Sequence, residues 1–143
     1  MPITKKDISV LKSKDWSFNW KTEANEVAKS VYKLVIVDNP TIVQGLISIE
    51  DRGNHYFIHL IESSKFNRGS KKLYLGVPGN LVAFASKQFF LKGYDGYVSF
   101  ESKTKLIQHY EKSLGAKILF GNYMAINSIA SAKLAGQYFP DFL

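Results

Sequence analysis

The sequence predicts a mixed α/β fold, in which a central, mostly antiparallel sheet is flanked by helices. In the first half of the chain, segments rich in β-branched and aromatic residues are separated by short turns, which indicates consecutive antiparallel strands. In the second half, segments with helical periodicity alternate with short strand-like segments, which indicates helices packed on the sheet. A length of 143 residues and a hydrophobic content of 45% are enough for one core, so we expect residues 1–143 to form a single domain.

The N-terminal part of the chain predicts only short elements. Trp16, Phe18 and Trp20 alternate with polar residues, which predicts a short strand with the three aromatic side chains on one face. Residues 21–30 include small and apolar side chains at helical spacing, which predicts a short helix.

Three strands are predicted over residues 31–37, 41–49 and 55–62. The first ends at Asp-Asn-Pro, residues 38–40, and a Gly-containing loop over residues 51–54 joins the other two. Such tight connections make an antiparallel meander. On the third strand, alternation predicts one face with Tyr56, Ile58, Leu60 and Glu62 and another with His55, Phe57, His59 and Ile61.

A helix is predicted over residues 80–92, which contain no Gly or Pro and place apolar side chains at helical spacing. Asn80 is a suitable N-cap for this helix, and Gly93 is a suitable residue just beyond its end.

The remaining elements follow the same reasoning. Residues 97–100 predict a short strand, and Ser102 can cap a helix over residues 103–114. Residues 117–126 predict a final strand, and residues 129–138 predict an Ala-rich terminal helix.

Composition narrows the classes of function. The net charge of +7 and the pI near 9.5 favour anionic partners such as nucleic acid or a phosphorylated cofactor. The absence of cysteine excludes a disulfide framework, a thiolate zinc site and a cysteine nucleophile. No signal-peptide pattern and no apolar run long enough to cross a bilayer is visible, so we expect a cytoplasmic protein that does not associate with membranes.

The glycine-bearing turn at residues 76–80 is the strongest local motif. It leads from a basic loop with Arg68, Lys71 and Lys72 into the predicted helix. A helix N-terminus presents unpaired N–H groups, and glycine lets a phosphate approach them. The turn matches neither the dinucleotide-binding nor the P-loop spacing. A turn that merely begins a helix is the alternative reading.

Three side chains could do chemistry, and each has a structural alternative. Tyr110 lies on a predicted amphipathic helix, and it is either a proton donor in a cleft or a tyrosine of the core. Glu62 lies at the end of a strand beside a loop, and it is either a general base or a surface carboxylate. His59 is a second base or a hydrogen-bonded core histidine. His55 and His59 are too far apart along a strand to chelate one ion easily, so no metal site is predicted.

Taken together, the order of antiparallel strands, a glycine-bearing turn into a helix, a strand, and a helix that ends Tyr-x-x-x-Leu-Gly-Ala resembles the GNAT superfamily of acyl-CoA-dependent N-acyltransferases. The resemblance covers roughly residues 31–126. Residues 76–80 look like the pyrophosphate loop of that family. Residues 106–116, with Tyr110, are similar to its helix end with a tyrosine shortly before a glycine.

The resemblance implies an acyl-CoA N-acyltransferase-like fold in which two central strands, here residues 55–62 and 97–100, splay apart. The pantetheine arm of acetyl-CoA would enter this gap and pair with the backbone of Leu60, Ile61 and Glu62. The pyrophosphate would lie on N–H groups of the glycine-bearing turn, near its basic neighbours. The implied pyrophosphate contacts are Gly76, Val77, Gly79, Asn80, Arg68, Lys71 and Lys72.

The implied reaction is direct attack of a primary amine on the thioester of acetyl-CoA, with no covalent enzyme intermediate. An ammonium must lose a proton before it attacks, and Glu62 is the candidate base, with His59 in reserve. Tyr110 would donate a hydrogen bond to the departing thiolate.

Two alternatives to this reading stay open. One is a non-enzymatic GNAT-like interaction module, and the other is acetylation of an aminoacyl-tRNA, which the basic charge permits. The acceptor is otherwise a small-molecule or protein amine, and a homodimer is a further option, because the C-terminal segment is apolar.

Overall fold

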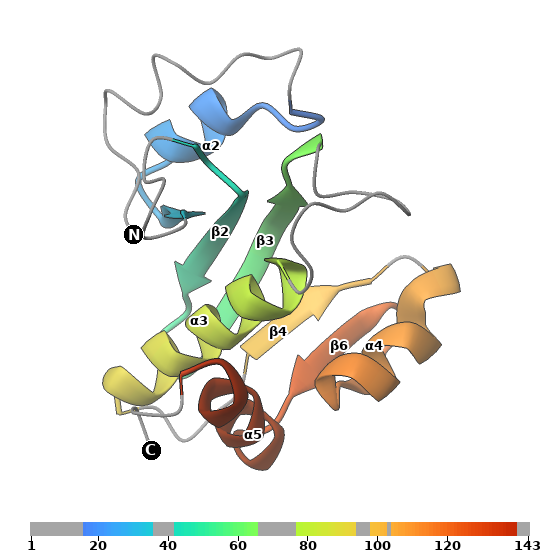
Figure 1. Cartoon of the computed structure of the whole chain (residues 1–143). Helices are drawn as coiled ribbons and strands as arrows, with labels where there is room; N and C mark the ends of the chain where they lie inside the picture. The colour runs from blue at the N-terminus through green and yellow to red at the C-terminus, as the bar shows by residue number, and fades with distance from the viewer. Residues whose placement is uncertain (1–15, 36–41, 66–76, 94–97, 103, 140–143) are drawn as a thin grey trace.

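The computed structural model describes residues 16–35, 42–65, 77–93, 98–102 and 104–139 (Figure 1). Within these residues, a short helix precedes three strands, and helices then alternate with strands. In chain order the elements are α2 (Trp20–Asn25), β1 (Lys29–Leu34), β2 (Gly45–Asp51), β3 (Tyr56–Ser63), α3 (Val77–Leu91), β4 (Val98–Glu101), a 3₁₀ turn (Thr104–Leu106), α4 (Ile107–Leu114), β5 (Lys117–Phe120), β6 (Tyr123–Ile126) and α5 (Ser128–Tyr138).

The described strands form one six-stranded sheet with the order β1-β2-β3-β4-β6-β5. All neighbouring pairs are antiparallel except β3 and β4, which are parallel. The predicted mixed α/β class, with a mostly antiparallel sheet flanked by helices, is confirmed.

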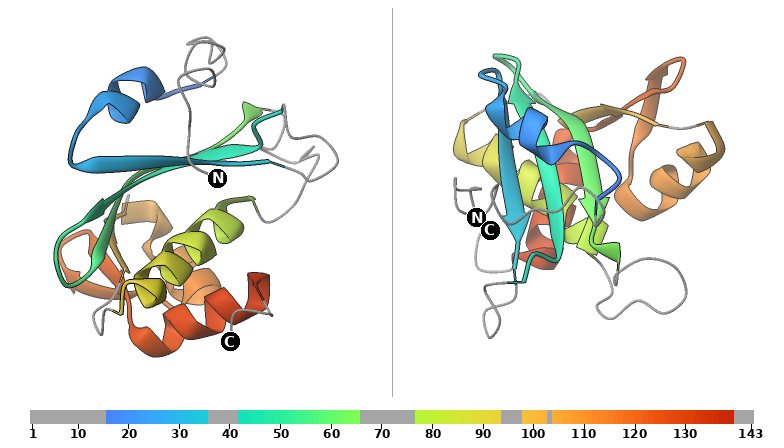
Figure 2. Two further views of the ribbon diagram at one scale, coloured as in Figure 1. Left: turned by 90° about the vertical axis from the view of Figure 1, so that its left-hand side faces the viewer. Right: turned by 90° about the horizontal axis from the view of Figure 1, so that it is seen from above.

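The main core lies between the sheet and α3. Phe89 and Ala85 on α3 are fully buried, and they belong to one cluster with Ile47 of β2 and Val98 of β4. Helix α5 packs on the outer side of α3 (Figures 1 and 2). Because α3 is covered on two sides, it is apolar around most of its circumference rather than along one stripe.

Helix α2 lies on the opposite face of the sheet, as Figure 2 shows from the side, and a smaller cluster lies under it. Trp20 of α2, with 2% of its surface exposed, packs with Val31 of β1 and Leu46 of β2. The two faces of the sheet are therefore covered unequally: the cluster under α2 involves β1, β2 and Leu60 of β3, and Trp20 of α2 also hydrogen-bonds to Glu62 of β3.

The strand predicted at Trp16–Trp20 is wrong. Residues 16–19 form a bend, and Trp20 begins α2, whose N-cap Asn19 accepts a hydrogen bond from the Thr22 N–H at 3.1 Å. Phe18 is 44% exposed, whereas Trp20 is buried, so the aromatic side chains do not share one face.

The single strand predicted over residues 117–126 is a hairpin. Strands β5 and β6 pair antiparallel, and Gly121 turns between them with a φ of 52°. Positive φ is easy for glycine, and a Gly-Asn pair is a known hairpin signal that the sequence did carry at Gly121 and Asn122.

Two predicted caps also differ. Helix α3 begins at Val77, so Asn80 lies in its first turn and is not the N-cap. Helix α4 begins at Ile107 after the 3₁₀ turn, and the Ser102 N–H donates to the Asn122 carbonyl at 2.8 Å instead of beginning the helix. The positions of Gly93 and Gly115 after their helices are confirmed, with φ values of 75° and 69°.

None of the described helices combines the length and apolar character that a membrane span requires.

Candidate functional site

Strands β3 and β4 separate from each other in the middle of the sheet. Their parallel pairing covers only three positions and ends at Ile58 and Phe100, whereas β3 continues to Ser63. The β3 backbone beyond Ile58 therefore has no β4 partner. Such an opening exposes strand-edge hydrogen-bonding groups inside the sheet.

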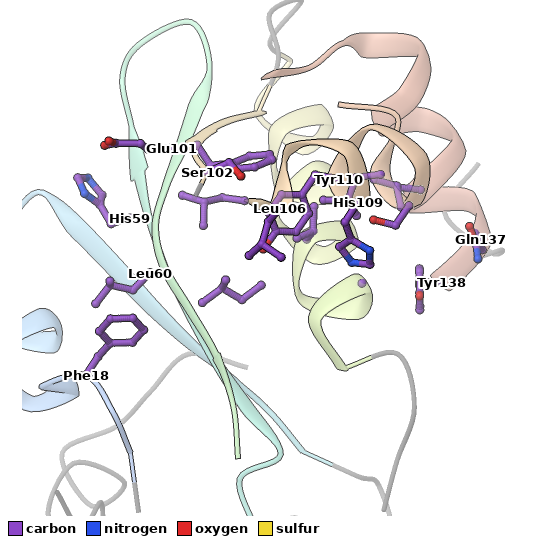
Figure 3. Close-up of a pocket in the computed structure, with 18 residues that line it drawn as sticks. Phe18, His59, Leu60, Glu101, Ser102, Leu106, His109, Tyr110, Gln137 and Tyr138 are labelled. Atoms are coloured by element: carbon purple, nitrogen blue, oxygen red, sulfur yellow. The ribbon is translucent and has the colours of Figure 1, made fainter. Parts of the chain in front are cut away.

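A cleft of about 420 Å³ occupies this opening (Figure 3). One wall is β3 at residues 58–61, and the other is the end of β4 with the inner side of α4. Gly79 of α3 and Tyr138 of α5 also line it. The lining is mostly apolar and carries a few polar groups, as is usual for a small-molecule site.

A β-bulge places His59 at the cleft. Ser48 of β2 pairs with Leu60, but its neighbour Ile49 pairs with Ile58, so the ladder skips His59. The extra residue reverses the alternation of β3: Ile58 and Ile61 pack in the α3 cluster, whereas Leu60 packs in the α2 cluster. The predicted common face of Ile58 and Leu60 is wrong, because a bulge shifts the two-residue period by one.

His59 is one of the predicted candidates that lie in the cleft. Its Nε2 is 2.7 Å from Oε1 of Glu50, which Arg52 also contacts at 3.2 Å. The hydrogen bond from His59, with help from Arg52, holds the pKa of Glu50 below its usual range. A carboxylate at Nε2 places the proton of the neutral ring on that nitrogen, which leaves the Nδ1 lone pair as an acceptor.

Tyr110 lies on the opposite wall. Its ring meets Phe100 edge to face, with ring centroids 5.3 Å apart. The Tyr110 carbonyl accepts hydrogen bonds from the N–H groups of Gly115 and Ala116. These bonds end α4 at the left-handed Gly115, shortly after Tyr110. Burial raises the pKa of the Tyr110 phenol, which therefore keeps its proton at neutral pH.

Glu62, the other predicted base, does not line the cleft. Glu62 is 7% exposed, and its carboxylate accepts hydrogen bonds from Ser17 N–H at 2.6 Å, Phe18 N–H at 3.2 Å and Trp20 Nε1 at 2.8 Å. The carboxylate oxygens are therefore turned toward these donors and away from a ligand in the cleft. These contacts favour a structural role, in which Glu62 anchors the segment that brings Phe18 to the cleft.

The predicted cofactor-binding residues divide into four groups. Leu60, Ile61 and Gly79 line the cleft, whereas Glu62, which follows Ile61 on β3, does not. Val77 and Asn80 lie in the first turn of α3, next to Gly79. Arg68, Lys71, Lys72 and Gly76 lie outside the described residues.

The lining residues that the sequence reasoning missed include Glu101, Gln137 and Tyr138. Tyr138 comes from the terminal helix, and its hydroxyl lies so close to Gly79 that a Cβ on Gly79 would collide with it. No local pattern signals such contacts, because Gly79 and Tyr138 are brought together only by packing of α5 on α3. Glu101 carried a weak signal as a charged residue at a strand end.

The described residues contain no group of three or more His, Cys, Asp or Glu side chains arranged to hold a metal ion.

Comparison with solved structures identifies proteins that have a similar fold. No protein-family model matches the chain, and no curated protein matches it. Among solved structures, KacTA in a complex with DNA has a TM-score of 0.61 at 16% identity and covers 82% of this chain and 79% of that chain. AtaTR bound with AcCoA has a TM-score of 0.60 at 15% identity, with the same coverage of 82% and 79%. A Bacillus subtilis acetyltransferase in complex with CoA has a TM-score of 0.55 at 14% identity, covering 86% and 90%.

The chain therefore has the fold of the GNAT acetyltransferases, as the strand order and motifs of the sequence predicted. The opened pair β3 and β4, with a cleft between them, is the part of this fold that can receive a ligand.

Proposed function

We propose that the protein is an acetyl-CoA-dependent N-acetyltransferase that moves an acetyl group to a primary amine by direct attack. The cleft between β3 and β4 is the observation that carries this proposal, because it joins the open edge of β3 to Tyr110 and His59. A non-enzymatic module of the same fold needs no such cleft, and side chains that filled the gap would have favoured it.

Acetyl-CoA fits the two ends of the cleft differently. Its pantetheine amides match the open β3 edge at Leu60 and Ile61, because an extended chain can pair there as an added strand. Its diphosphate matches the first turn of α3, where Gly79 puts no side chain on the wall and unpaired N–H groups favour an anion. Arg68, Lys71, Lys72 and Gly76 remain predicted contacts of the diphosphate. Structural neighbours with AcCoA or CoA bound support this choice of co-substrate.

His59 is the base in this proposal, in place of Glu62. The incoming ammonium gives one proton to Nδ1 of His59, and the imidazolium is stabilised through Nε2 by Glu50. The neutral amine then forms the N–C bond to the acetyl carbonyl carbon while the C–S bond breaks, and the nitrogen releases its surplus proton to solvent as the amide forms. The electron pair of that bond leaves on the sulfur of CoA.

Tyr110 is the acid. Its phenol, whose ordinary pKa of about 10 is raised further by burial, carries its proton at neutral pH and can donate a hydrogen bond to the sulfur as negative charge develops there. A thiolate with a pKa of about 8.5 needs little help to leave, so most of the acceleration comes from positioning, which can supply about 7–11 kcal/mol.

The acceptor is a small-molecule or protein amine in this proposal, with aminoacyl-tRNA as the alternative. The Y144F mutant of the toxin AtaT, bound to the C-terminus of the antitoxin AtaR, is a further structural neighbour with a TM-score of 0.54 at 15% identity. That complex supports a protein partner for this chain as part of the proposal. A homodimer remains a separate prediction from the sequence.

The proposal is tested with acetyl-CoA and a Tyr110→Phe variant. We expect acetyl-CoA to raise the melting temperature of both proteins, because a ligand at 100 times its Kd stabilises by about 2.7 kcal/mol. We expect kcat of the variant to fall by about 100-fold with its acetyl-CoA affinity unchanged, because only the proton donor is lost.

Tyr32→Phe is the matched control, since Tyr32 lies on β1 against Phe84, away from the cleft, and its loss should leave kcat unchanged. No thermal shift with millimolar acetyl-CoA would overturn the assignment. An unaltered kcat in Tyr110→Phe would remove Tyr110 from the mechanism.

A further inference from the structure

Glu101 lines the cleft at the same end as His59 (Figure 3). The last β3–β4 pair is Ile58 with Phe100, so His59 and Glu101 are the next residues on two neighbouring parallel strands. Both side chains line the cleft, and Figure 3 shows them at the same end, far from Gln137 and Tyr138. Because both residues directly follow the last paired positions of the two strands, one small ligand can reach both of them.

Apart from histidines, Glu101 is the charged side chain among the described residues that line the cleft, although the chain as a whole carries +7. Glu50 is balanced by Arg52 and is hydrogen-bonded to His59. Among the described residues, the side chain of Glu101 has no hydrogen-bond or ion-pair partner, and it is exposed. An unpaired carboxylate beside a cleft attracts cations and repels anions.

Aromatic rings stand beside the two residues. Tyr123 of β6 is the register partner of Glu101, and its ring centroid is 6.4 Å from that of Phe57. The Phe57 ring lies 4.9 Å from the His59 ring. The Arg52 guanidinium already lies over the Phe57 ring, 3.9 Å from its centroid, so a cation packs on an aromatic face beside this end of the cleft.

We infer that the acceptor is a primary amine with a second positive charge, such as a diamine, and that Glu101 binds the charged group that does not react. This inference rests on the proposed acetyl transfer and names its substrate class. The reacting nitrogen then lies next to His59, and the alkyl chain between the two nitrogens spans the distance from His59 to Glu101. Glu101 is a specificity-determining residue in this arrangement, because it contacts the acceptor but takes no part in the bond changes.

The experiment compares three amines of equal chain length: 1,4-diaminobutane, butylamine and 4-aminobutanoate. Thiol release from acetyl-CoA measures the transfer. We expect kcat/KM to be at least about tenfold higher for the diamine than for butylamine, and lowest for 4-aminobutanoate, because the second group changes from cation to none to anion.

Glu101→Gln should lower kcat/KM for 1,4-diaminobutane by about tenfold, mainly through KM, and leave the values for butylamine and the KM for acetyl-CoA unchanged. Glu101→Asp should restore part of the preference. Glu111→Gln is the matched control, since Glu111 is an exposed carboxylate on α4 that does not line the cleft, and it should behave as wild type. Equal turnover of the three amines, or a diamine preference that survives Glu101→Gln, would overturn the inference.

Direct binding separates this inference from the proposed function. Calorimetry with 1,4-diaminobutane should show binding to wild type that Glu101→Gln weakens by about tenfold, whether or not acetyl-CoA is turned over. If acetyl-CoA fails to bind but the diamine binds through Glu101, the transferase proposal fails and the cation site stands. If acetyl-CoA binds and the diamine does not, the cation site is wrong and the transferase proposal stands.

Discussion

The carboxylate of Glu62 shows how a single residue can have the right chemistry for one task and the surroundings of another. Its sequence position, at the end of a strand, suits a catalytic base. Its actual neighbours are the backbone of Ser17 and Phe18 and the indole of Trp20, all more than forty positions away. Hydrogen bonds from three donors hold a buried carboxylate in a fixed position.

We expect Glu62→Gln to destabilise the fold and to spare the chemistry. Glutamine offers one acceptor oxygen and presents an NH₂ donor to N–H groups, so the free energy of unfolding should fall by about 2–3 kcal/mol in urea denaturation. Well below the melting temperature, kcat should stay within about threefold of wild type.

Glu111→Gln serves again as the control, and its free energy of unfolding should change by less than about 0.5 kcal/mol. A Glu62→Gln protein of normal stability but with kcat reduced by orders of magnitude would restore Glu62 as the base.

At the level of elements, the contact between α3 and α5 shapes one end of the cleft. Gly79 in the first turn of α3 faces the hydroxyl of Tyr138 on α5, with Cζ of that ring 3.1 Å from the position that a Cβ would take. Glycine at this position therefore serves the packing of the terminal helix as well as the openness of the cleft wall.

Gly79→Ala and Tyr138→Phe should be coupled. Alanine favours a helix over glycine by about 1 kcal/mol, but a methyl group forced against the tyrosine costs about 1–3 kcal/mol. We expect Gly79→Ala to destabilise the wild-type protein and to cost less, or to stabilise, when Tyr138→Phe removes the hydroxyl. The double-mutant cycle of unfolding free energies measures this, and additive effects would contradict the contact.

The β3 bulge is the second element-level feature. A perfect two-residue period would have placed His59 and Leu60 on opposite faces of a continuous ladder, whereas the skipped position leaves His59 at the cleft and Leu60 in the α2 cluster. Bulges of this kind redirect side chains beside functional sites.

On the scale of the whole molecule, burial of a neutral phenol links stability to pH. Burial raises the pKa of Tyr110, so the folded protein keeps this proton at pH values where the unfolded chain releases it. The unfolded state then binds fewer protons, and the free energy of unfolding falls as pH rises above about 10, the unfolded value, and through the raised folded value.

We expect this alkaline loss of stability to be smaller in Tyr110→Phe than in wild type, while the two proteins change alike with pH below about 9. Urea denaturation over this pH range measures the difference. Identical alkaline slopes for the two proteins would show that the Tyr110 phenol is not buried as described.

The sequence by itself determined the class of fold, the three-strand meander, the helices after it and the position of Tyr110. These features depend on local causes: residue periodicity, turn chemistry and a left-handed glycine such as Gly115. The hairpin at Gly121 was also encoded locally, in a Gly-Asn pair that the prediction overlooked.

Only the tertiary structure decided which side chains meet at the cleft. One skipped residue in a ladder reverses the faces of β3, and no pattern within β3 reveals it, because the pairing with β2 defines it. The pairs His59–Glu50, Glu62–Trp20 and Gly79–Tyr138 likewise join separate elements. Periodicity reports which face of an element is buried, whereas contacts between elements depend on how the whole chain packs.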